Sequence, residues 1–400
     1  MPVINSVAAL KDEIAAYRQE LHKNPQTAFE ETFASEFVAQ KLTEWGIPFK
    51  RGLGVTGIVA TIEGKTNKSG KTIGLRGDMD ALDIEEKTGL PHASQNPGKM
   101  HACGHDGHTA TLLGTAKHLK DTGNFDGTVH LIFQPAEEGE GGAMKMIEDG
   151  LFKDFPCDYV FGIHNWPGLP IGHVATRVGP LLAATDEFIV TIKGQGGHAA
   201  MPHLTTDPAV IAAHIVTSLQ TIVSRNVDPI DTAVISVCNM QSGTGAFNII
   251  GDTAKLNGTV RTFSPETRKF VRERMDVLIK NMAKAFGAEV EMEYFGNIEP
   301  TVNTQDGVEM ASRAASVIVG EENVDADCPP CMGGEDFGAF LQQAPGAFLF
   351  VGQATKDKNS PHNQGLHTSY YDFNDDIIPI GMSYFTTLVE QYMPADEKAA

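Results

Sequence analysis

Residues 109–121, TATLLGTAKHLKD, decide the fold class because they carry apolar side chains at helical spacing between short β-like runs. KTIGLRGD (71–78) precedes them, TVHLIFQPAEE (128–138) follows, and GIVATIEG (57–64) is a further run. Strands that alternate with helical patterns predict an α/β fold with a mainly parallel sheet. Its functional groups are expected at the edge where the strands end in loops. Further helices are predicted over 8–23, 29–46 and 376–393.

A second pattern begins near Thr185. It predicts, in order, strand 186–193, helix 207–225, strand 232–241, strand 252–262, helix 265–286 and strand 288–295. The order βαββαβ is typical of the ferredoxin-like unit. The sequence therefore predicts an inserted domain over 185–296, between the first part (1–184) and the second part (297–400) of the α/β domain.

Composition and charge exclude several classes of protein. The 400 residues are 41% hydrophobic, as in soluble globular proteins, and 31 basic against 51 acidic side chains give a net charge of −20. A field of this sign repels nucleic acid and anionic membranes, so neither is expected as a partner. No signal peptide or membrane-spanning run is recognisable, and the five cysteines are sparse. These features predict a cytoplasmic protein with reduced or metal-bound thiols.

The segment 100–108, MHACGHDGH, contains three histidines and Cys103. Thiolate and imidazole are ligands that zinc and similar metals select, and the glycines allow the backbone to turn tightly. Isolated histidines are usually surface or hydrogen-bonded core residues, but such a dense cluster favours a metal site.

Two carboxylates, Glu137 and Glu138, follow the strand-like run that ends near Gln134. Such pairs are commonly solvated loop residues. The alternative is that one carboxylate binds metal while the other acts as a base. His164 in GIHNWP and His362 in SPHNQG are further loop histidines, and ligands scattered along the chain favour a catalytic metal site over a structural one.

Two other patterns have weaker support. The spacing of Gly52, Gly54 and Gly57 fits a dinucleotide-binding motif, but a β-like run follows in place of the required helix. Cys328 and Cys331 have the spacing of a redox pair but lack its strand-to-helix setting, so we interpret them as loop cysteines.

Seven motifs together resemble the M20 metallopeptidase family, most closely its amidohydrolase branch of hippurate hydrolases, aminoacylases and auxin-conjugate hydrolases. The motifs are RGDMDAL (76–82), MHACGHDGHTA (100–110), FQPAEEGEGGA (133–143), GIHNWP (162–167), GGHAAMPH (196–203), GTVRTF (258–263) and GGEDF (333–337). The resemblance implies a zinc-peptidase-like catalytic domain with an inserted lid domain.

The resemblance also implies a site with two divalent metal ions, for which zinc, manganese, nickel or cobalt are suitable. Cys103 resembles the bridging ligand; the terminal ligands implied are His105 and His164 for one ion, and Glu138 and His362 for the other. Two residues are implied beside the ligands, Glu137 as general base and Asp80 as a residue that orients a ligand or the water.

Three residues of the inserted domain complete the implied site. His198 resembles a residue that stabilises the oxyanion, from the neighbouring subunit in many dimeric relatives, and Asn248 with Arg261 resembles a pair that grips the substrate carboxylate. An ordinary turn histidine and a surface arginine are the alternatives. A homodimer or homotetramer is expected.

The expected activity is hydrolysis of N-acyl amino acids to a carboxylic acid and a free amino acid by a metal-activated water. N-acetyl-diaminopimelate deacetylase and auxin-conjugate hydrolase are alternatives within this class. Two alternatives from other classes remain: a metal- or peptide-binding protein without turnover, and a thiol oxidoreductase that uses Cys328 and Cys331.

Overall fold

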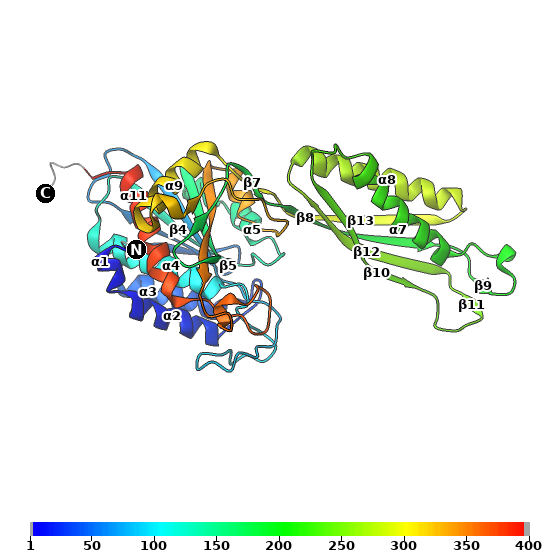
Figure 1. The fold of residues 1–400 in the computed structure, drawn as a ribbon, viewed down its shortest axis with the longest axis horizontal. Helices are drawn as coiled ribbons and strands as arrows, with labels where there is room; N and C mark the ends of the chain where they lie inside the picture. The colour runs from blue at the N-terminus through cyan, green and yellow to red at the C-terminus, as the bar shows by residue number, and fades with distance from the viewer. Residues whose placement is uncertain (1–2, 396–400) are drawn as a thin grey trace. The chain divides into compact units, whose positions relative to one another are not determined.

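The computed structural model describes residues 3–395, which divide into two compact units (Figure 1). Unit 1 comprises Met1–Leu181, Thr301–Pro330 and Asp336–Ala400, and unit 2 comprises Leu182–Pro300 and Cys331–Glu335. The inserted segment predicted over 185–296 lies close to the observed 182–300. The short return of the chain into unit 2 at 331–335 has no counterpart in the prediction.

Unit 1 is built on an eight-stranded sheet with the order β1-β2-β4-β3-β5-β16-β6-β15. The central neighbours β3, β4, β5 and β16 run parallel, whereas β1 and β2 pair antiparallel. Strand β6 pairs antiparallel with β16 and parallel with β15. The sheet is thus mainly parallel at its centre, as predicted. The strands are β1 Phe49–Leu53, β2 Gly57–Glu63, β3 Thr72–Asp78, β4 Thr128–Gln134, β5 Tyr159–Pro170, β6 Val174–Ala175, β15 Val324–Asp325 and β16 Gly346–Ala354.

The long helices of unit 1 pack on the sheet and on one another. Helix α4 (His105–Thr122) contacts β3, α2 and α11, and α11 also contacts α9. Helix α4 is buried along almost its whole length, which explains its apolar and small side chains. The other long helices are α2 Lys11–Lys23, α3 Thr32–Glu44, α9 Gln305–Val319 and α11 Ile378–Tyr392.

Helix α3 begins later than predicted, at Thr32 instead of residue 29. Phe29 has a φ of 61°, in the left-handed region, so a helix cannot continue through it. Backbone N–H groups that precede the helix are bonded locally, as Phe29 N–H donates to Glu31 Oε1 at 3.0 Å. The apolar spacing of the sequence did not reveal this turn.

Unit 2 is a four-stranded antiparallel sheet with the order β10-β12-β8-β13 and two long helices, which is the ferredoxin-like arrangement. Strand β8 alternates buried and more exposed residues, so one of its faces forms the core. Both helices contact the sheet. The elements are β8 Ala184–Lys193, α7 Pro208–Arg225, β10 Ala233–Ser242, β12 Thr253–Thr262, α8 Pro265–Ala285 and β13 Glu289–Ile298.

Local capping explains why the helix starts of unit 2 were readable from sequence. Asp207 accepts a hydrogen bond from Ala209 N–H at 2.9 Å, and Ser264 accepts one from Thr267 N–H at 3.1 Å. A proline follows each cap at the first helical position, where its missing N–H costs nothing.

The remaining elements are short, and the described residues contain no helix that is both long and apolar enough to cross a membrane. The short elements are α1 Asn5–Ala8, α5 Gly142–Glu148, α6 Leu151–Asp154, α10 Gly338–Leu341, β7 Gly179–Leu182, β9 Gly197–His198, β11 Ile249–Ile250, β14 Thr301–Asn303, η1 Pro202–Leu204, η2 Glu321–Asn323, η3 Pro361–Asn363 and η4 Asp375–Ile377.

Candidate metal centre

Cys103 and His105 lie on either side of the glycine that starts α4. Gly104 has a φ of 101°, which a residue with a Cβ rarely adopts. A Cβ at this position would lie 2.3 Å from Asn165 Oδ1 and 2.6 Å from Tyr371 Oη, so only glycine fits. This tight turn brings the thiol and the imidazole, both buried, to one point at the end of β3.

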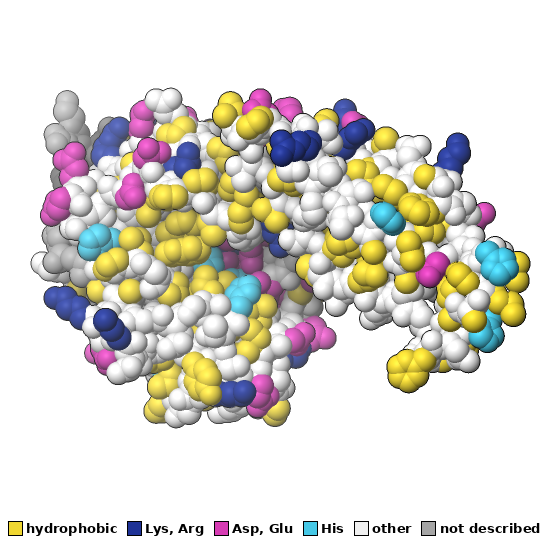
Figure 2. All heavy atoms as spheres, turned by 45° about the vertical axis from the view of Figure 1, so that its right-hand side comes forward, with side chains coloured by type: hydrophobic (Ala, Val, Ile, Leu, Met, Phe, Trp, Pro, Cys, Tyr) yellow, Lys and Arg dark blue, Asp and Glu magenta, His cyan; other side chains and the backbone are white. Residues whose placement is uncertain are grey.

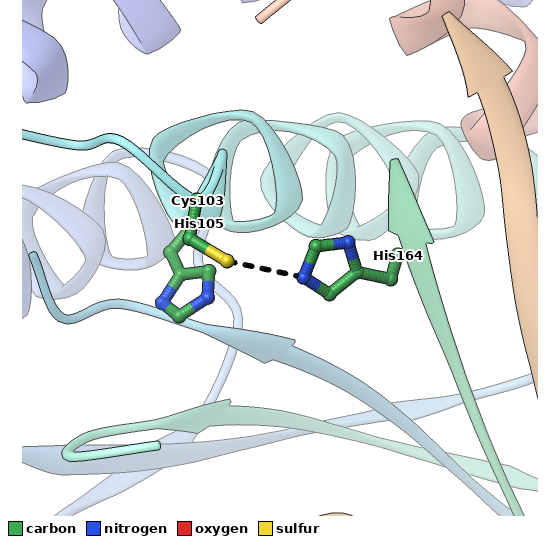
Figure 3. Close-up of side chains that lie close together, drawn as sticks. All are labelled: Cys103, His105 and His164. Carbon is green, nitrogen blue, oxygen red and sulfur yellow. Dashed lines mark hydrogen bonds between the residues drawn. The ribbon is translucent and has the colours of Figure 1, made fainter. Parts of the chain in front are cut away.

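His164, on β5, meets Cys103 across the sheet edge (Figure 3). Its Nε2 lies 3.3 Å from Cys103 Sγ, and its Nδ1 lies 2.7 Å from the carbonyl oxygen of Asn165. A carbonyl only accepts, so Nδ1 carries the proton and Nε2 presents a lone pair towards the thiol. Burial and the neighbouring His108 hold the pKa of His164 well below its ordinary value, which keeps the ring neutral.

Glu137 and Glu138 reach the same point from the end of β4. The chain turns at Ala136, which has a φ of 52° and donates its N–H to Glu31 Oε1 at 2.9 Å. As a result, Glu137 Oε2 and Glu138 Oε1 each lie 3.9 Å from Nε2 of His105. The two carboxylates are therefore part of the cluster, not solvated loop residues.

Asp80 connects the ring of His105 to the backbone of Glu138. One of its oxygens lies 3.1 Å from His105 Nδ1, and the other accepts the N–H of Glu138 at 2.9 Å. Burial lowers the pKa of His105, but Asp78 and Asp80 outweigh it and raise the pKa to about 10. Because Nδ1 of His105 is bonded to Asp80, its Nε2 faces the carboxylates of Glu137 and Glu138. This Nε2 is buried and has no hydrogen-bond partner.

The structure does not place His362 with the other predicted ligands. Its Nδ1 lies 3.2 Å from the carbonyl oxygen of Asp372, and no ligand group of three found among residues 3–395 contains it. His367 takes this place, because its Nε2 lies 3.2 Å from Glu138 Oε1 and it groups with Cys103. The geometry therefore favours His367 over the predicted His362 as the ligand. Both are loop histidines, and the sequence carried no signal to separate them.

Two ligand groups share the thiol of Cys103. One contains Cys103, His105 and His164, the other Cys103, Glu138 and His367, and within each group the ligand atoms lie within 4.8 Å of one another. Sulfur, imidazole and carboxylate form the donor set of borderline-soft divalent metals. The partnerless Nε2 of His105 fits a metal ligand as well, since a buried polar atom is normally satisfied.

The three predicted residues of unit 2 fall into two places. His198 pairs with Ile249 in the β9–β11 ribbon, and Ala199 N–H donates to Asn248 O at 3.0 Å, so His198 and Asn248 are neighbours. Arg261 lies opposite Thr185, at the other end of the sheet.

The length of the sheet separates these two places. Strand β8 runs from Thr185 to Lys193 between them, roughly 26 Å at 3.3 Å per residue. Within one chain, Asn248 and Arg261 therefore do not grip the same carboxylate as a pair. Figure 1 shows β9 and β11 beyond the end of β8.

A protein-family model matches most of the chain. Residues 74–391 match the model of peptidase family M20/M25/M40. The chain belongs to the M20 family. The M20 resemblance, the fold class and the expected hydrolase class are thereby confirmed.

Similar M20 proteins extend over nearly the whole chain. Hippurate hydrolase of Campylobacter jejuni is 40% identical over 98% of this chain and 100% of its own length. IAA-amino acid hydrolase ILR1-like 4 of Arabidopsis thaliana is 36% identical over 96% of this chain and 86% of its own length. The YXEP protein of Bacillus subtilis, described as a dinuclear metal binding peptidase, superposes with a TM-score of 0.81 at 32% identity, covering 97% of this chain and 100% of that one.

Proposed function

We propose that the protein is a metal-dependent amidohydrolase that cleaves N-acyl amino acids, hippurate-type compounds among them, into a carboxylic acid and an amino acid. The observation that carries the proposal is the pair of ligand groups that share Cys103, with the buried carboxylate of Glu137 beside them. The names of the similar hippurate and IAA-amino acid hydrolases support the substrate class.

Two divalent ions would be held by residues of unit 1 alone. Cys103 would bridge them, with His105 and His164 on one ion and Glu138 and His367 on the other. Such ions supply a nucleophilic water at neutral pH and polarise the scissile carbonyl. Asp80 keeps Nδ1 of His105 engaged, so that its Nε2 serves as the ligand atom.

Glu137 is the proposed general base. The residue is 6% exposed, and its Oε2 lies 3.9 Å from Nε2 of His105, so the carboxylate borders the ligand cluster. In this role it accepts a proton from the attacking water and later delivers it to the departing amine. Glu138, beside it, is the proposed ligand, because its Oε1 faces both His105 and His367.

Arg261 is the proposed group for the carboxylate of the substrate. Its side chain is half-buried, and its Nη1 donates to Thr259 Oγ1 and to the carbonyl of Val260. Both bonds are made by Nη1. The other nitrogens of the planar guanidinium suit the two oxygens of a carboxylate.

His198 and Asn248 are proposed to act on substrate bound to a second copy of the chain, within a homo-oligomer. Apolar side chains are exposed around them, as Figure 2 shows at that end of unit 2. Phe247 and Ile249, which flank Asn248, are 106% and 49% exposed, and Met201 and Leu204 follow His198. An apolar patch of this kind is typical of a protein interface.

The alternative that uses Cys328 and Cys331 as a redox pair has less support. Neither cysteine is in a disulfide, and burial raises the pKa of Cys328 to about 11, which disfavours the reactive thiolate.

Because all five cysteines are free thiols, we propose a cytoplasmic location, where thiols stay reduced.

The decisive experiment measures bound metal and hydrolysis of N-benzoylglycine together. The purified protein should contain about two ions per chain, lose activity when a chelator removes them, and regain it when zinc, manganese, nickel or cobalt is restored. Chelated protein that retains full hydrolysis would exclude the metal mechanism. Metal-loaded protein that hydrolyses no N-acyl amino acid would exclude the proposed activity.

A further inference from the structure

Arg18 on α2 lies in a largely buried cluster of charged side chains next to the start of α4. Its Nε lies 2.8 Å from Asp106 Oδ2, its Nη2 donates to Asp372 Oδ1, and its Nη1 lies 3.6 Å from Asp375 Oδ1. Arg18 itself is 0% exposed. One guanidinium thus faces three carboxylates, each with a different nitrogen.

These carboxylates belong to two segments that also carry proposed metal ligands. Asp106 directly follows His105 in the first turn of α4. Asp372 and Asp375 follow His367 in the segment that leads into α11. A second contact joins the two segments beside the proposed metal ligands. The backbone N–H of His367 donates to the carbonyl oxygen of Ala102, which precedes Cys103, at 2.8 Å.

We propose that Arg18 is a positioning residue of the metal centre. It holds the start of α4 and the segment 367–375 at the separation at which Cys103 and His367 ligate one ion. The inference rests on the proposed function, because it concerns the metal site.

The neighbouring histidines do not duplicate this role. His22 Nδ1 lies 2.8 Å from Asp106 Oδ2, and His92 Nε2 lies 3.0 Å from Asp372 Oδ1. Each histidine therefore reaches a carboxylate of only one segment, whereas Arg18 reaches both. A lysine has a single nitrogen on a flexible stem and cannot reproduce the fork.

Stability alone is a weak explanation for such a cluster. A buried ion network is often no more stabilising than apolar side chains of the same volume, because the charges lose their hydration. A geometric role does require this network, since the ion pair of Arg18 with Asp106 and its charged hydrogen bond to Asp372 together fix the distance between the two segments. The distinguishing property is thus metal affinity, not the stability of the fold.

The test compares Arg18→Lys and Asp372→Asn with the wild-type protein, all prepared without metal. Binding of Co²⁺ is measured by competition with a chromogenic chelator, and the visible spectrum of the Co²⁺-loaded protein is recorded. We expect the dissociation constant to rise at least about tenfold in both variants, with altered absorption bands. Asp372→Asn keeps the shape of the side chain, so it also serves if Arg18→Lys folds poorly.

Arg268→Lys is the matched control. Arg268 lies in unit 2, where its Nε bonds both oxygens of the buried Asp186 at 2.9 and 3.0 Å, so its loss also disrupts a buried ion pair. This variant should unfold at lower temperature but bind Co²⁺ within twofold of wild type. Unchanged Co²⁺ affinity and spectrum in Arg18→Lys and Asp372→Asn would overturn the positioning role of Arg18 but would leave the proposed function standing. A wild-type protein that binds no Co²⁺ would overturn the proposed function as well.

Discussion

The backbone N–H of His367 donates to the carbonyl oxygen of Ala102 at 2.8 Å. This single bond fixes a loop near the C-terminus against the residue that precedes Cys103. It explains why the exposed His367, and not His362, faces Glu138. The two histidines are only five positions apart along the chain, but Nδ1 of His362 lies close to the carbonyl oxygen of Asp372.

Replacing these two histidines should have opposite outcomes. His367→Ala should lose bound metal and lower kcat/KM for N-benzoylglycine at least about 100-fold, because a direct ligand matters more than its supporting contacts. His362→Ala is the control and should keep its metal. Metal analysis of both variants checks the assignment, which fails if His362→Ala is the variant that loses metal.

Glu137→Gln should abolish most turnover but not metal binding. The amide keeps the size of the side chain but cannot accept a proton, so kcat should fall by about 10²- to 10⁴-fold. Glu138→Gln, the adjacent control, should lose metal because it removes a proposed ligand. Near wild-type turnover in Glu137→Gln would contradict its role as base.

The structure shows which features the sequence determined locally. The helices of unit 2 start at Pro208 and Pro265 because each cap and its proline are adjacent in sequence. The prediction of Cys103, His105 and Glu138 as ligands was likewise local, since the first two lie in a dense His/Cys motif before α4 and Glu138 follows the end of β4.

Features that depend on long-range contacts were not readable. The separation of Asn248 from Arg261 follows from strand register, which connects Arg261 to Thr185. The contact of Arg18 with Asp372 joins residues 354 positions apart, and no local pattern indicates it. The choice between His362 and His367 depends on the backbone hydrogen bond from His367 to Ala102, which also joins distant parts of the chain.

Asp80→Asn tests whether orientation of the ligands matters. Asp80 contacts both His105 and the backbone of Glu138, so the neutral amide should weaken both contacts. Loss of such a supporting contact typically lowers metal affinity by about 10- to 100-fold. A chelator titration measures this directly, and an unchanged affinity would show that His105 and Glu138 are held in place without Asp80.

His130 should contribute to acid sensitivity of the fold. Burial lowers its pKa to about 4, and the ring packs on Phe155 with centroids 5.4 Å apart. The folded state therefore prefers the neutral ring. Its contribution is complete above about pH 6.5, the pKa of an unfolded histidine, and is lost as the pH falls towards 4.

The variant His130→Gln isolates this contribution. Glutamine stays neutral, so the free energy of unfolding should fall less between pH 6.5 and 4 than in wild type, by roughly 3 kcal/mol at most. Urea unfolding at several pH values gives the comparison. Parallel pH profiles for the two proteins would show that the buried ring does not control acid stability.

Arg261→Ala should discriminate between substrates by charge. If the guanidinium binds the α-carboxylate, kcat/KM for N-benzoylglycine should fall about 10- to 100-fold or more, because a charge-assisted bidentate contact is lost. Hydrolysis of N-benzoylglycinamide, which lacks that charge, should change little. Arg261→Lys should recover only part of the loss, since an ammonium group cannot form the two parallel bonds. Equal losses on both substrates would indicate that Arg261 supports the sheet, where it already bonds Thr259, and does not bind substrate.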